Sequence, residues 1–79
     1  MKKFIDFKNF LNKYNIMLFD GDCRIAHYHY LQLNNSFNQT GGSLANKIKN
    51  NGENLLRIFV YSLVTNNVNR INYILEKII

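Results

Sequence analysis

The sequence has no proline, a single cysteine and no long apolar run. One cysteine, Cys23, excludes an internal disulfide, and small secreted domains usually need several, so we expect an intracellular, cytoplasmic protein. The basic start of the chain is interrupted by Asp6 and Lys8 where a signal peptide would be apolar. Because no apolar run approaches the roughly 18–20 residues of a membrane span, we expect no membrane contact.

Acidic residues are also few: five, against ten lysines and arginines, which gives a net charge of +5. The excess lies at the two ends, since residues 1–13 and 42–79 each carry +3 and residues 14–41 carry −1. This distribution favours a polyanionic partner, either nucleic acid or a nucleoprotein.

Asparagine, by contrast, is abundant. It occurs fourteen times, and together with the missing proline this indicates an AT-rich coding sequence, typical of an AT-rich bacterium, its phage or another virus. Asparagine favours helix caps and turns over helix interiors. The pairs at residues 34–35, 50–51 and 66–67 therefore predict element boundaries.

A chain of 79 residues, 47% of them hydrophobic, forms one compact domain. Residues 54–64 are its most apolar stretch and predict a central core helix. Net stability is modest in so small a domain, so a partner or a second copy of the chain can complete the burial of its apolar surface. Formation of a homodimer is therefore one of the alternatives.

The fold that we predict is α+β. Phe4, Phe7, Leu11 and Tyr14 form one apolar stripe, which predicts an amphipathic helix over residues 3–14. A β-hairpin follows, with its turn at residues 20–21 (Asp-Gly) and its second arm over residues 22–33, where apolar and polar residues alternate. The competing interpretation is a helix with Asp22 as its N-cap, and hence an all-α fold.

The remainder of the chain is predicted to be a loop and three helical segments. The loop covers residues 34–43, and Ser43 caps a short helix over residues 44–49. The core helix follows, and an apolar stripe predicts a last helix after residue 67. The last two helices should pack as an antiparallel pair because their connection is short.

The candidate binding residues combine aromatic and basic side chains on the hairpin and the short helix. Bases would stack on the aromatic rings, and basic side chains would bind phosphates, with the N-terminal lysines also available. The tyrosines have a competing interpretation as half-buried sheet residues. The predicted site for protein or nucleic acid contains Arg24, His27, Tyr28, Tyr30, Lys47 and Lys49.

His27 and His29 raise the question of a metal site or a nuclease. They share a strand face with Cys23 in the predicted hairpin, but closed metal sites usually draw on two separated ligand pairs, and no second pair exists. We therefore predict no metal and no other cofactor. A small histidine-dependent nuclease stays as an alternative function, because a histidine pair can supply general acid and base.

Residues 16–23, with the run Asp-Gly-Asp-Cys, resemble the opening of the DCC family of thiol-disulfide oxidoreductases. In that family a second cysteine follows three residues later, where this sequence has Ala26. The resolving thiol is absent, so dithiol chemistry within this chain is excluded.

In size, asparagine-rich composition and lack of a known motif, the chain resembles small orphan proteins of phages and mobile elements, among them anti-CRISPR proteins. The resemblance implies a non-enzymatic inhibitor that binds a host protein or ribonucleoprotein complex through its basic surface, with RNA contact open. No site residue is carried over from it. A direct RNA- or DNA-binding regulator is the alternative.

Overall fold

Five α-helices make up the part of the chain that the computed structural model describes, residues 1–37 and 43–78, and this part contains no strand. Their order is α1 (Phe4–Lys13), α2 (Asp20–Phe37), α3 (Leu44–Asn50), α4 (Glu53–Thr65) and α5 (Val68–Ile78). Residues 38–42, in the predicted loop, lie outside this description. The predicted α+β class is therefore wrong, and the all-helical alternative is the observed fold.

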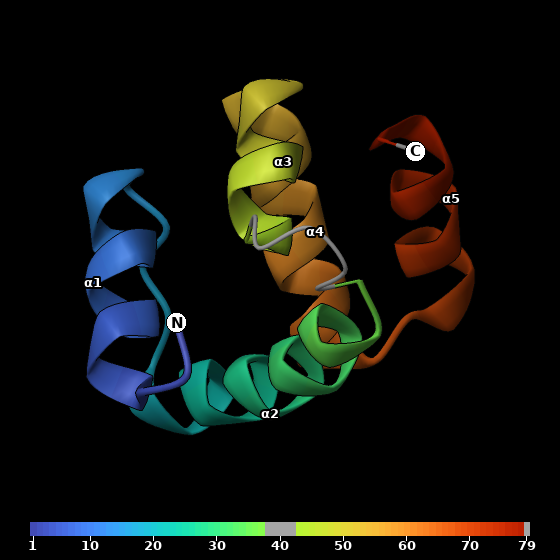
Figure 1. The fold of residues 1–79 in the computed structure, drawn as a ribbon. Helices are drawn as coiled ribbons and strands as arrows, with labels where there is room; N and C mark the ends of the chain where they lie inside the picture. The colour runs from blue at the N-terminus through green and yellow to red at the C-terminus, as the bar shows by residue number, and fades with distance from the viewer. Residues whose placement is uncertain (38–42, 79) are drawn as a thin grey trace.

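Helix α4 is the centre of the fold, as its apolar sequence predicted. It packs against α2, α3 and α5, and α1 packs on α2. In Figure 1, α2 runs across one end of the other helices, and α3 and α4 lie between α1 and α5. Helices α4 and α5 are neighbours that run in opposite directions, which confirms the predicted antiparallel pair.

The predicted hairpin is replaced by α2, the longest helix. Cys23, Ala26 and Tyr30 are buried along it, whereas Ile25 is exposed. These positions follow the helical period and cut across the strand alternation. An isolated hairpin is at best marginally stable, while a helix pairs its own backbone groups and directs one stripe of side chains into the core.

The start of α2 explains why residues 20–21 form no turn. Asp20 and Asp22 lie in the first helical turn, where negative charge interacts favourably with the helix dipole. A type I′ turn needs positive φ at both central residues, but Gly21 has helical backbone geometry here. Asp22 is not the N-cap, because the helix begins two residues earlier.

Two asparagines end helices in the left-handed conformation that glycine usually takes. Asn15, after α1, has φ 59°, and Asn66, after α4, has φ 51°. At the first of these ends the N–H of Ile16 donates to the carbonyl of Leu11 at 2.9 Å, and both side chains are buried. This is the Schellman arrangement with its usual hydrophobic contact.

The free N–H groups in the first turn of α3 are bound by the side chains of Ser43, Asn34 and Tyr30. Ser43 Oγ accepts from the N–H of Asn46 at 3.1 Å, which confirms the predicted cap. Asn34 Oδ1 accepts from the N–H of Leu44 at 3.1 Å. Asn34 itself belongs to α2, which continues to Phe37, and its side chain caps α3. The boundary predicted at residues 34–35 is therefore wrong. The boundaries predicted at residues 50–51 and 66–67 are confirmed.

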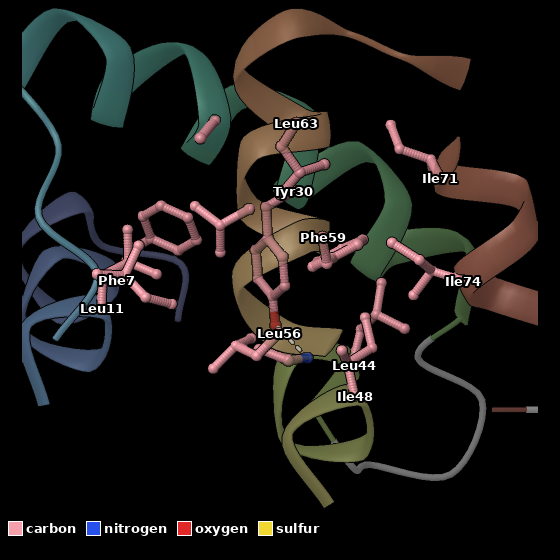
Figure 2. Close-up of a cluster of buried hydrophobic side chains, with 14 of the residues drawn as sticks. Phe7, Leu11, Tyr30, Leu44, Ile48, Leu56, Phe59, Leu63, Ile71 and Ile74 are labelled. Carbon is pink, nitrogen blue, oxygen red and sulfur yellow. Dashed lines mark hydrogen bonds between the residues drawn. The ribbon is translucent and has the colours of Figure 1, made fainter. Parts of the chain in front are cut away.

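The core joins all five helices. Figure 2 shows the ring of Tyr30 among apolar side chains of α1, α3 and α4, including Phe7, Leu44 and Leu56. Among the described residues no helix has both the length and the apolar character that crossing a membrane requires.

Candidate nucleic-acid interface

Tyr14 stands at the end of α1, directly after Lys13. Its ring is half-buried and packs edge-on against Phe10, with the ring centroids 5.0 Å apart. The amphipathic stripe of α1 holds one side of the ring against the domain. The backbone then turns through Asn15, so the Tyr14 ring lies at a helix end and is still partly open to solvent.

Two lysines from different helices lie over this ring. The Nζ atoms of Lys13 and Lys49 are each 5.7 Å from the centroid of Tyr14. This is within the range in which a cation is attracted by the ring face. Because Lys49 belongs to α3, the folded chain is needed to bring the two ammonium groups together. We call these three residues the Tyr14 site.

Among the described residues, no carboxylate forms an ion pair with the lysines of the Tyr14 site. Within residues 1–37 and 43–78 the one ion pair joins Lys8 Nζ to Asp20 Oδ1 at 2.6 Å. Lys13 and Lys49 take no part in it. An aromatic ring flanked by two such ammonium groups offers a stacking surface and two phosphate contacts side by side.

The predicted site residues on α2 are dispersed around the helix. Arg24 is exposed, with its guanidinium carbon 4.2 Å from the ring centroid of Phe4 at the start of α1. Ten residues of helix separate Phe4 from Tyr14, a length of about 15 Å. Tyr28 is 61% exposed and contacts the ring of His29 edge-on. The structure therefore does not bring Arg24 and Tyr28 to the Tyr14 site.

Two other predicted residues are buried. Tyr30 is 1% exposed, and its hydroxyl accepts from the N–H of Ala45 at 3.3 Å. His27 is also buried, between the rings of Phe4 and Phe7, and its Nε2 bonds to the carbonyl of Met1 at 3.1 Å. Both side chains stabilise the fold, and neither is placed to stack on a base.

The two histidines have different partners on different elements. His29 Nδ1 lies 2.7 Å from the carbonyl oxygen of Leu63 in α4, whereas His27 bonds at the N-terminus. Since a carbonyl only accepts, each of these ring nitrogens carries the proton. Among the described residues no group of three or more His, Cys, Asp or Glu side chains is placed to hold a metal.

Cys23 lies inside the core with 1% of its surface exposed. Burial raises the pKa of its thiol above the ordinary value. Thiolate is the reactive form of cysteine, so this environment is that of a packing residue.

Of the predicted residues, Lys49 alone belongs to the Tyr14 site, while Lys47 is exposed on the same short helix. Sequence reasoning placed Tyr14 in the apolar stripe of the first helix and did not select it for binding. The available signal was its position: a tyrosine at the end of the stripe, next to a lysine. The contribution of Lys49 could not be read from the sequence, because 35 positions separate it from Tyr14.

Comparison of the chain with family models, with curated proteins and with solved structures finds no match.

Proposed function

We propose that this protein is a non-enzymatic nucleic-acid-binding protein that holds a single strand, free or exposed on a nucleoprotein, at the Tyr14 site. The observation that carries the proposal is the convergence of Lys13 and Lys49 on one aromatic ring, with each Nζ 5.7 Å from its centroid. The net charge of +5 supplies long-range attraction to such a strand.

Binding requires a base to compete with the lysines for the ring. A cation–π contact at an exposed site contributes about 0.5–1 kcal/mol. Stacking of a base on an aromatic side chain is worth about 1–3 kcal/mol. A base therefore displaces an ammonium group from Tyr14, and the displaced lysine binds the adjacent phosphate.

The charge also favours nucleic acid over the protein part of a nucleoprotein. Protein channels that hold nucleic acid are themselves positively charged, so they repel a basic chain. The RNA or DNA strand of such a complex attracts it. Inhibition of a host nucleoprotein, which the class resemblance implies, would then follow from covering an exposed strand.

A histidine-dependent nuclease is not favoured by the arrangement. His27 is buried against Met1 and the phenylalanines of α1, and His29 bonds to α4. A general acid and a general base must both reach the reacting phosphate. The two histidines do not converge on one point where a phosphate could lie.

The test is fluorescence anisotropy with a labelled single-stranded RNA and a DNA of the same sequence. Lys49→Glu should weaken binding about tenfold, because it removes one phosphate contact and adds a repulsive charge. Lys77→Glu is the matched control. It makes the same change in net charge at a lysine that also lies over a tyrosine ring, 4.9 Å from the centroid of Tyr73 on α5.

The comparison of the two variants decides between a site and general attraction. Equal weakening by Lys49→Glu and Lys77→Glu would show that net charge alone binds the strand. Tyr14→Leu separates stacking from charge, because it removes the ring and leaves both lysines. Unchanged affinity in Tyr14→Leu would show that base stacking on Tyr14 does not contribute to binding.

A further inference from the structure

The segment that links α1 to α2 leaves large apolar side chains in solvent. Phe19 is 86% exposed and Met17 is 74% exposed. With half-buried Leu18 they line an open depression of about 410 Å³, which Asp22 of α2 and Tyr61 of α4 complete. Tyr61 is itself 47% exposed. Contiguous exposed apolar groups of this kind mark interaction surfaces.

A second depression, of about 360 Å³, shares Tyr61 with the first. It is lined by Tyr61, Ser62, Thr65, Asn67 and Arg70. Since both depressions include Tyr61, they are neighbouring parts of one surface. The first contributes apolar side chains and Asp22, and the second contributes Arg70. We call this the Tyr61 surface. It comprises the residues that line the two depressions.

Asp22 and Arg70 are the charged side chains of the Tyr61 surface. In the part of the chain that the structure describes, residues 1–37 and 43–78, neither Asp22 nor Arg70 takes part in an ion pair. Among the described residues, the Tyr61 surface thus carries one negative and one positive side chain without an ion-pair partner, one in each of the two depressions that share Tyr61.

We propose that the Tyr61 surface binds a second copy of this chain across a two-fold axis near Tyr61. In a two-fold contact the same patch is used twice, so residue i of one copy meets residue j of the other and the reverse. A rotation about Tyr61 places Asp22 of each copy opposite Arg70 of the other. It also covers each Phe19 with the half of the surface that carries Thr65 and Arg70.

A second copy fits better than an unrelated protein because the surface contains both halves of its own charge complement. The surface is electrically balanced, so the net charge of +5 does not oppose the contact locally. A small domain also has a high ratio of surface to volume, and burial between two copies removes apolar area that one copy leaves exposed. This inference does not depend on nucleic-acid binding, because Lys13 and Lys49 belong to the Tyr14 site.

The first test is sedimentation velocity of the purified full chain over a wide range of concentration. The wild type should shift from monomer to dimer as concentration rises. Phe19→Ser should stay monomeric, and it should not disturb α2, because serine is a favourable residue directly before a helix. Tyr28→Ser, which removes a comparably exposed aromatic ring on the outer side of α2, should dimerise as the wild type does.

A charge exchange then tests the two-fold geometry. Asp22→Arg and Arg70→Asp should each weaken dimerisation at least tenfold, because each places like charges opposite one another. The double variant Asp22→Arg/Arg70→Asp should restore it to within a fewfold of the wild type. A wild type that is monomeric at every concentration would overturn the inference, as would a dimer that persists in Phe19→Ser or a double variant no tighter than the single ones. Binding of a different protein to this surface by a monomeric wild type would likewise assign it to that protein.

Discussion

The phenol oxygen of Tyr30, in the middle of α2, accepts a hydrogen bond from the backbone N–H of Ala45, in the first turn of α3, at 3.3 Å. The first turn of a helix cannot pair its own N–H groups, so a side chain from another helix fills the place of a cap. Ala45 is buried, and its N–H would not reach water if the phenol oxygen were removed. This contact fixes α3 on α2.

We therefore expect Tyr30→Phe to lower the free energy of unfolding by about 1–3 kcal/mol, the cost of leaving a buried donor unpaired. Tyr28→Phe removes the same hydroxyl from an exposed ring of the same helix and should have little effect. Urea denaturation followed by far-UV circular dichroism measures both. Equal stabilities for the two variants would contradict the conclusion that the Tyr30 hydroxyl caps the first turn of α3.

Two glycines should respond to alanine with opposite signs. Gly21 lies in the first turn of α2 with no atom within 4 Å of an added Cβ, so Gly21→Ala should stabilise the protein by up to about 1 kcal/mol. Gly52 precedes α4 with φ 130°, so Gly52→Ala should destabilise it by about 1–3 kcal/mol. Thermal or urea unfolding of the two variants provides the comparison.

The same pair of variants distinguishes the helix from the predicted hairpin. In a type I′ turn Gly21 would need positive φ, and alanine there would destabilise the fold. Destabilisation by Gly21→Ala would therefore contradict α2 as described, because a glycine with helical geometry and open space around it gains from a side chain.

The contact between Lys8 and Asp20 should appear in the titration of the carboxylate. The hydrogen bond and the charge of Lys8 lower the pKa of Asp20 below its ordinary value of 3.8. A depressed folded-state pKa means that the pair stabilises the fold above pH of about 3.8 and that this contribution is lost as pH falls through the folded-state pKa. The pair is exposed, so the contribution to stability is small.

Carboxyl carbon NMR shifts against pH measure this pKa directly. Lys8→Gln should return the pKa of Asp20 towards its ordinary value, and so should high salt, which screens the charge. Lys77→Gln removes the same charge from α5 and should leave the Asp20 titration unchanged. If the pKa of Asp20 is the same in wild type and in Lys8→Gln, the ion pair between Lys8 and Asp20 does not form in solution.

The sequence predicted the helices whose apolar residues follow one period without interruption. Helix α4 was predicted from its dense apolar run, α5 from its stripe, and the cap at Ser43 from a serine before a short apolar segment. Each of these depends on residues close together in the chain, so local reasoning was sufficient.

Helix α2 was the competing interpretation and not the predicted one, because its apolar residues satisfy two periods. The alternation over residues 22–33 matches a strand, while Cys23, Ala26 and Tyr30 match a helix. The choice depends on which set is buried, and α4 and α1 decide that by packing on one face. Short-range signals such as the Asp-Gly pair do not contain this information.

The candidate site has the basic and aromatic character that the sequence predicted, but Lys49 is the one residue that it shares with the predicted set. A basic and aromatic surface was expected on the strand, but helical geometry buries His27 and Tyr30 and separates Arg24 from the lysines of α3. The Tyr14 site is formed by residues from the end of α1 and from α3. Its assembly depends on how those helices pack, which the sequence pattern does not specify.

Strand binding at the Tyr14 site is tested most directly by the salt dependence of oligonucleotide affinity, compared between wild type and Lys13→Gln/Lys49→Gln. Each phosphate contact on a single strand contributes about 0.7 to the slope of log affinity against log salt. Two lost contacts should reduce the magnitude of the slope by about 1.4. A double variant with the wild-type affinity and slope would contradict the proposal that Lys13, Tyr14 and Lys49 bind the strand.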